Sequence, residues 1–288
     1  MRRPRDMMRL KTRKRRARFA LSALRYGVIL VSLCVAVLPL YWMLHEAVQS
    51  AAYRFVLPPS LLPRDPTTSG LISVLSGDGP HWLLNTLVVA VGTALLALVI
   101  GAWGAYALSR FTDRGVGAAA YLVLATQFMP PAVLMIPMFR VLVDFRLDDS
   151  LPGLVLADLV FTLPVTTWIL KSIFDAIPVD FEEAAMVDGC NRMLALWHVV
   201  LPITLPGIIA AGIFAFLESW GEFMFARTVI SDPSNWVGSI GISSFLSEYG
   251  PRWDQVMATA FVFTLPPVIL FLSVQKYFVA ALQGGVKG

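Results

Sequence analysis

The sequence predicts an all-α integral membrane protein with six transmembrane helices. Hydrophobic residues make up 57% of its 288 residues and charged residues only 15%, which leaves too little polar surface for a soluble domain of this length. Several apolar runs reach the roughly 20 residues that a helix needs to cross the core of a bilayer. Lysine and arginine are concentrated at the N-terminus, where residues 1–25 hold 11 of the 23. The first two observations predict a multi-pass protein, and the third predicts its orientation.

The expected spans are residues 27–44, 83–108, 116–139, 151–171, 203–226 and 257–281. The first ends in Tyr41-Trp42, an aromatic pair suited to the membrane interface. The second has no ionisable side chain except the Tyr106 phenol, and as a helix it is roughly 39 Å long. Prolines recur in the last four spans. They can kink helices around a pathway, but membrane helices also tolerate proline well, so both interpretations stay open.

Residues 1–26 form a basic arm in front of the first span. Such an arm could bind nucleic acid or anionic lipid headgroups. Directly before an apolar run, it more simply holds the N-terminus in the cytoplasm, and we expect no nucleic-acid partner. An even number of spans then places the tail, residues 282–288, in the cytoplasm as well.

The sequence offers no site for a cofactor or metal. Cys34 and Cys190 lie far apart, and the three histidines are scattered, so neither a disulfide framework nor a metal pattern is present. The chain also lacks the GxxxxGK[ST] loop that binds nucleotide phosphates. We therefore expect this chain to bind no cofactor.

The long connection between the fourth and fifth spans, residues 177–202, has the pattern of a helix–turn–helix. Pro178 suits a first helical position, and Gly189 predicts a helix stop. Asn191 can cap a second short helix that ends before Pro202, where the next span starts. Acidic residues favoured by the helix dipole fill the first turn: Asp180, Glu182 and Glu183. The apolar stripe of the second helix comprises Leu194, Trp197 and Leu201.

This loop is either a docking element or an ordinary ordered loop, and the residues alone favour neither. Ala184 and Ala185 would let the surface of another protein approach closely, and the neighbouring acids offer hydrogen-bond acceptors.

The loop resembles the EAA motif of ABC-importer permeases, which reads Glu, Ala, Ala, three residues, Gly, nine residues, an aliphatic residue, one residue and Leu-Pro. The matching residues are Glu183, Ala184, Ala185, Gly189, Val199, Leu201 and Pro202, with valine in place of the more usual isoleucine. The resemblance extends from about Asn85 to Gly288 and is greatest to maltose-type carbohydrate-uptake permeases. Further matching stretches include AYALSRF at 105–111 and KYFVAAL at 276–282.

This resemblance implies the type I ABC importer permease fold, with a permease core at 80–281 that contains the coupling loop 177–202. It implies a transport subunit in a bacterial or archaeal cytoplasmic (inner) membrane, and not an enzyme. Its partners would be a second, related permease subunit, a dimer of nucleotide-binding ATPase subunits that use ATP and Mg²⁺, and an extracytoplasmic solute-binding protein. The residues implied in coupling are Glu183, Ala184, Ala185, Asp188, Gly189, Leu201 and Pro202.

Polar residues within the expected spans are candidates for the substrate path. The carboxylates of Asp158, Glu218 and Glu222, with the amide of Gln127, could hydrogen-bond sugar hydroxyls. Alternatively, the carboxylates pair with arginines such as Arg140 and Arg227 or contact the partner permease. Trp220 and Phe223 could stack on a sugar face. Gly221 stands where the family usually has asparagine, which leaves the identity of the sugar open.

Two alternatives to a sugar permease remain. The same machinery could carry a polyol, a glycerol phosphate or a peptide. More remotely, Asp144, Asp148 and Asp149 could hold Mg²⁺ and a diphosphate, as in a membrane-embedded transferase. However, only one such cluster is present, it lies in an expected outer loop, and Asp149-Ser150 followed by Pro152 is typical of a helix start.

Overall fold

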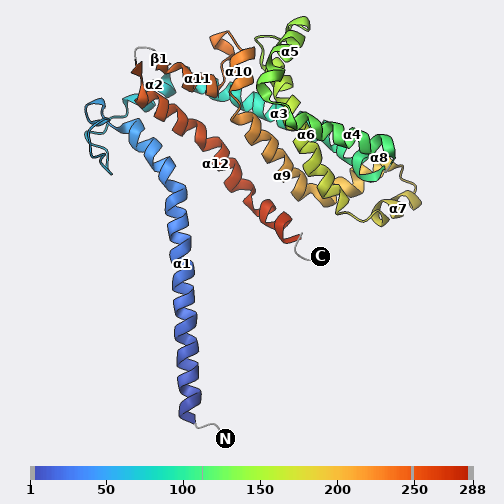
Figure 1. The fold of residues 1–288 in the computed structure, drawn as a ribbon, viewed down its shortest axis with the longest axis horizontal. Coiled ribbons are helices and arrows are strands. Elements are labelled where there is room, and N and C mark those ends of the chain that lie inside the picture. Colours follow the sequence, from blue (N-terminus) through green and yellow to red (C-terminus); the bar gives the residue numbers. More distant parts are fainter. Residues whose placement is uncertain (1–3, 112, 248–249, 285–288) are drawn as a thin grey trace.

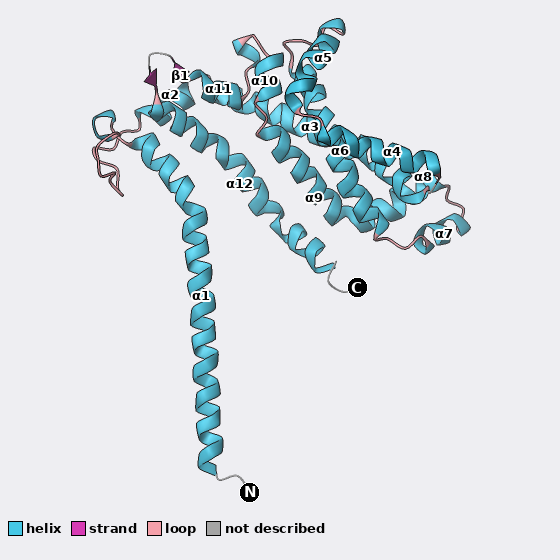
Figure 2. Cartoon of the chain, in the orientation of Figure 1, coloured by secondary structure: helices cyan, strands magenta, loops and turns pink. Residues whose placement is uncertain are grey.

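Long helices dominate the computed structural model, which describes residues 4–111, 113–247 and 250–284 (Figures 1 and 2). Five helices are long and apolar enough to cross a membrane, and one bent pair would make a sixth. The five are α1 (Pro4–Val48), α3 (Gly79–Arg110), α6 (Leu151–Asp175), α9 (Leu201–Trp220) and α12 (Trp253–Gly284). The predicted helical membrane architecture is therefore confirmed.

The centre of the fold is the packing of α3 on α6, with α9 against both and α12 against α9. Small residues let the first two helices approach closely. A Cβ atom at Gly101 would lie 3.3 Å from the Thr167 hydroxyl, and one at Gly104 would lie 3.4 Å from the methyl group of the same threonine. Ala97 and Ala105 on α3 are fully buried. Without a hydrophobic driving force between helices in lipid, such close contact is what holds them together.

The prediction of a single helix over the third span, 116–139, is wrong. The chain forms α4 (Arg114–Ala125), a short 3₁₀ turn η2 (Thr126–Phe128) and α5 (Pro131–Asp144), with a bend of 105°. Met129 and Pro130 are extended at the break. A proline disfavours the helical conformation in the residue before it, and Pro130-Pro131 applies this restriction twice in succession. The prolines inside α6, α9 and α12 do not interrupt those helices.

α1 runs without interruption from Pro4 through the predicted basic arm and first span. In Figure 1 it extends away from the other helices, and only its C-terminal part lies near α12 and α2 (Ser69–Ser76). Residues 1–3 of the predicted arm and 285–288 of the predicted tail lie outside the described residues.

The connecting segments gather at two opposite ends of the helices (Figure 1). At one end lie η1 (Ala51–Tyr53), α2, α10 (Met224–Val229), η4 (Pro233–Asn235) and α11 (Gly238–Ser244). An antiparallel ladder of β1 (Leu246–Ser247) and β2 (Gly250–Pro251) lies there too, which the all-helical prediction omitted. At the other end lie α7 (Asp180–Val187) and α8 (Arg192–Ala195), toward which the C-terminal part of α12 also points.

The predicted second loop helix does not end before the fifth span. α8 continues through a π-helical turn η3 (Leu196–Val200) into α9, so that one helix runs from Arg192 to Trp220. A proline ring inside a helix meets the carbonyl four residues earlier, here that of His198. The wider turn over these residues accommodates Pro202 without ending the helix.

We expect Gly153→Ala to destabilise the fold by about 1–3 kcal/mol, as overpacking does. A Cβ atom at Gly153 would lie 1.9 Å from the backbone oxygen of Leu147, which cannot move aside as a side-chain end can. Thermal unfolding of the purified chain in nanodiscs measures the effect. Gly117→Ala is the matched control, because nothing lies within 4 Å of its Cβ position. Equal unfolding temperatures for the two variants would contradict this packing.

Candidate functional site

The loop between α6 and α9 is ordered by its own caps. α7 ends in a Schellman motif, in which Cys190 N–H bonds to Ala185 O at 3.0 Å and Gly189 N–H to Met186 O at 3.1 Å. Gly189 has φ +95°, a conformation that glycine adopts without steric cost. The Asn191 side chain accepts a 2.8 Å hydrogen bond from Leu194 N–H at the start of α8. The helix stop and the cap predicted from sequence are both confirmed.

A buried carboxylate fixes α7 against the end of α3. Glu182 is only 4% exposed. It accepts hydrogen bonds of 2.6 Å from the Tyr106 hydroxyl and 2.6 Å from Arg110 Nε. Arg110 also donates to the Ile177 carbonyl at 3.2 Å. Sequence reasoning did not find this anchor, although its signals were visible: a lone phenol in an otherwise non-ionisable span, and an arginine one turn later.

Anchoring Glu182 leaves the neighbouring motif residues on the outside. Glu183, Ala184, Asp188 and Gly189 are exposed, and Ala185 is half-buried. A Cβ atom at Gly189 would meet nothing within 4 Å. The exposed surface of α7 therefore combines small residues and carboxylates with two large apolar side chains, Phe181 at 53% and Val187 at 87% exposure.

The start of α9 connects this loop rigidly to the helix bundle. Leu201 packs with a buried cluster that includes Tyr106, Leu170 and Val200, whereas Pro202 is exposed. Of the predicted apolar stripe only Leu201 packs on this cluster, since Leu194 and Trp197 are 43% and 53% exposed. The wide turn η3 changes the helical register, so that other residues face the core: Ala195, Leu196 and Val200.

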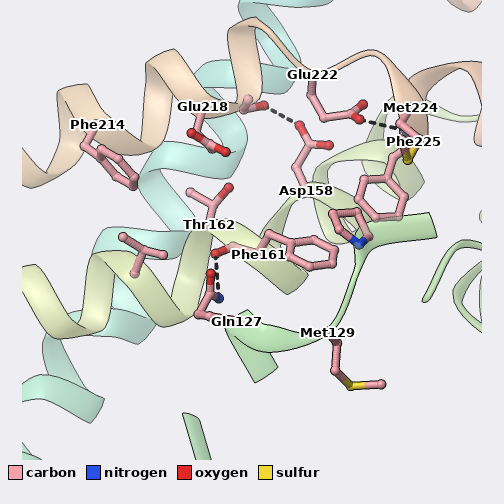
Figure 3. Close-up of a pocket in the computed structure, with 13 residues that line it drawn as sticks. Gln127, Met129, Asp158, Phe161, Thr162, Phe214, Glu218, Glu222, Met224 and Phe225 are labelled. Atoms are coloured by element: carbon pink, nitrogen blue, oxygen red, sulfur yellow. Dashed lines mark hydrogen bonds between the residues drawn. The ribbon is translucent and has the colours of Figure 1, made fainter. Parts of the chain in front are cut away.

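A cavity of about 350 Å³ opens near the other end of α6, between α6, α9, α10 and the break before α5 (Figure 3). Four of the predicted path residues line it: Gln127, Asp158, Glu218 and Glu222. The broken third span contributes Gln127, Met129 and Pro131 to its wall. Sequence reasoning missed the aromatic residues Phe161, Phe214 and Phe225, because nothing distinguishes them from other apolar residues of a span.

The polar side chains of the cavity differ in how many hydrogen bonds they make within the chain. Glu222 accepts hydrogen bonds from Phe225 N–H and Ala226 N–H, both at 2.8 Å, at the start of α10. Gln127 donates to the Phe161 carbonyl at 3.3 Å. Asp158 is 3% exposed, and one of its oxygens accepts a hydrogen bond from the Ser219 hydroxyl. Its other oxygen, Oδ1, is buried and has no hydrogen-bond partner.

Two predicted path residues do not line this cavity. The indole N–H of Trp220 donates to the Phe263 carbonyl at 3.1 Å, and the Trp220 ring stacks on Phe216 at 5.2 Å between centroids. Phe223 is 44% exposed and is absent from the cavity wall. Within the described ranges, no ion pair joins the cavity carboxylates to Arg140 or Arg227.

Asp149, one of the three aspartates considered for a diphosphate site, has a structural role. Asp149 Oδ1 accepts hydrogen bonds from the backbone N–H groups of Ser231 and Asp232, each at 2.9 Å. Ser150 caps α6 by accepting from Gly153 N–H at 3.1 Å, as the sequence predicted. These contacts tie the start of α6 to the segment that follows α10.

The long apolar helices, joined by an ordered loop between α6 and α9, define a multi-pass membrane protein. The family described as the inner membrane component of binding-protein-dependent transport systems matches residues 97–284, and the chain belongs to this family. It is therefore a membrane-embedded transport component and not an enzyme, as the motif resemblance implied.

The relatives agree in length as well as in sequence. The chain is 33% identical over 272 residues to a sulfoquinovosyl glycerol transport system permease protein of Agrobacterium fabrum, covering 94% of this chain and 95% of the relative. It is 30% identical to a trehalose/maltose transport system permease protein of Thermococcus litoralis, covering 90% and 94%.

A solved structure has the same fold. A chain of a bacterial ABC transporter involved in the import of the acidic polysaccharide alginate superimposes with a TM-score of 0.75 at 22% identity, covering 91% of this chain and 98% of that chain.

We expect Glu182→Ala to lower the free energy of local unfolding of α7 by about 3–5 kcal/mol, because it leaves the buried Arg110 guanidinium without its ion-pair partner. Hydrogen exchange of the amides at 180–195 should accelerate accordingly. The matched control is Glu183→Ala, which removes an exposed carboxylate one residue away and should leave exchange unchanged. Equal protection in both variants would show that Glu182 does not anchor the loop.

Proposed function

We propose that this chain is the permease subunit of an ATP-binding-cassette importer, forms half of the translocation pathway for a sugar, and couples it to a separate ATPase. The observation that carries this proposal is the α7 loop. It presents an exposed helix face at one end of the membrane helices, where Glu182 attaches α7 to α3 and α8 continues into α9.

The complete importer would contain a second, related permease, two nucleotide-binding ATPase subunits and an extracytoplasmic solute-binding protein. ATP and Mg²⁺ would bind to the ATPase subunits, and this chain would bind no cofactor. The membrane would be the cytoplasmic membrane of a bacterium or archaeon. Both termini would be cytoplasmic, which the basic N-terminal segment supports.

Coupling would work through the exposed residues of α7. Glu183 would make a polar contact with the ATPase, while Ala184, Ala185 and Gly189 would allow close steric fit in a cleft of that subunit. Glu182 joins α7 to α3, and α8 is continuous with α9. Closure of the ATPase pair would therefore displace α6 and α9 as rigid elements and change access to the pathway.

The solute would be a mono- or oligosaccharide. The relatives named for trehalose/maltose and sulfoquinovosyl glycerol support this class. The cavity on α6 and α9 also supports it, because carboxylates accept hydrogen bonds from hydroxyl groups and aromatic rings pack on sugar faces. A polyol, a glycerol phosphate or a peptide is the alternative cargo for the same machinery.

Affinity purification of the tagged full-length chain from its native membrane tests the assembly. We expect nucleotide-binding ATPase subunits and a second permease to co-purify after cross-linking, identified by mass spectrometry. Recovery of the intact chain without any nucleotide-binding subunit would contradict the proposed function.

We expect Gly189→Asp to abolish solute uptake while the protein stays in the membrane. The new side chain would project into the open space that the docking ATPase would occupy, and it would strain a backbone of φ +95°. Uptake by reconstituted importer and the amount of inserted chain are the two measurements. Gly115→Asp is the control, since Gly115 is exposed with nothing near its Cβ position but lies outside the loop. Unchanged uptake in the Gly189 variant would refute the coupling role.

A further inference from the structure

We propose that the cavity between α6, α9 and α10 binds a protonated amine of the transported solute, so that the cargo is an amino sugar. This inference rests on the proposed transport function and specifies the chemical class of the solute.

The first reason is that Asp158 is buried with an unpaired oxygen. Its side chain is only 3% exposed, and Oδ1 has no hydrogen-bond partner. A buried carboxylate that lacks a partner costs far more free energy than an exposed one. Ionisable residues at such positions in a membrane protein are usually functional. Asp158 also lies on the cavity wall, where a bound solute can supply the missing partner (Figure 3).

The second reason is the balance of charge around the cavity. Glu218 and Glu222 line the same space as Asp158, and no lysine, arginine or histidine is among the described residues of its wall. Glu222 is engaged by two backbone N–H groups, whereas Glu218 is exposed. Within the described part of the chain no cation lines the wall beside this group of carboxylates, and a cationic solute can supply the counter-charge.

The third reason is the aromatic wall. The rings of Phe161 and Phe225 stack with centroids 5.4 Å apart, and Phe214 lines the opposite part of the cavity (Figure 3). The face of an aromatic ring attracts a cation, and the attraction strengthens when water is excluded. Carboxylates combined with aromatic faces favour an ammonium group over a neutral hydroxyl and strongly disfavour an anion.

The size of the cavity fits a small part of a solute. Its volume of about 350 Å³ is at the lower end of the range of ligand pockets, about 300–1,000 Å³. One aminated sugar ring is a suitable occupant, and further rings would extend toward the partner permease. The chain would accordingly reject acidic saccharides, in contrast to the structurally similar importer of the acidic polysaccharide alginate.

Binding to the full importer in nanodiscs tests this proposal with three matched probes. They are the disaccharide of glucosamine, its neutral N,N′-diacetyl form and digalacturonate, each titrated calorimetrically at neutral pH. We expect the amine to bind roughly tenfold more tightly than the acetylated form, because its charge-assisted contact is stronger, and digalacturonate not to bind.

Asp158→Asn should remove this preference, because the amide keeps the shape and the Ser219 contact but not the charge. Glu218→Gln, at an exposed position, should reduce the preference without a risk to folding. Asp148→Asn, an exposed acid outside the cavity, should retain it. Thermal unfolding of each variant verifies that the protein is folded.

The proposal would be overturned by equal affinity for the amine and its acetylated form. It would also be overturned if the preference for the amine survived both Asp158→Asn and Glu218→Gln. Failure of all three probes to bind would overturn it as well. ATP-driven uptake of a neutral sugar without any amine preference would refute this inference and leave the proposed transport function intact. Absence of the ATPase from the purified complex would refute that function instead.

Discussion

The close packing of α3 on α6 is the constraint on which the rest of the structure depends. Apolar side chains gain nothing by leaving lipid for one another, so helices in a membrane associate through close contact and hydrogen bonds. Gly101 and Gly104 allow this contact at Thr167, and fully buried alanines continue it along α3. Because α6 is fixed in this way, everything attached to its two ends has a defined position.

Those two ends carry the cavity and the loop that contains α7. Near the start of α6, Asp158 meets Ser219 of α9 and lines the cavity. Beyond its end, α7 returns to the tip of α3, where Tyr106 and Arg110 bind Glu182. The same pair of helices, α6 and α9, thus forms a wall of the cavity and carries the loop that contains α7.

One face of α7 can stay exposed because the buried carboxylate of Glu182 fixes the helix in position. In the motif Glu182-Glu183-Ala184-Ala185, the first carboxylate is buried and paired, while the second is exposed beside two small residues. A buried ion pair is weak evidence for stability, but it specifies geometry well when all its hydrogen bonds are made. Glu182 and Glu183 are therefore adjacent in sequence but differ in burial.

The sequence by itself determined the class of protein, the positions of most spans, the caps of the loop between α6 and α9, and the four polar residues that share the cavity. Each of these follows from local chemistry: apolar length, the conformations open to Gly189 and Asn191, and the high cost of polar groups in lipid. The break of the third span at Met129-Pro130 also has a local cause in the two prolines, although the sequence analysis missed it. Only the tertiary structure decided that Trp220 packs on Phe216 and not in the cavity. It also decided which polar groups meet, as Tyr106 and Glu182 do across 76 positions and Asp158 and Ser219 across 61. The physical reason is that a span apolar on all sides carries no periodic signal of its rotation. Which face turns toward a neighbouring helix is then settled by close packing between segments far apart in the chain.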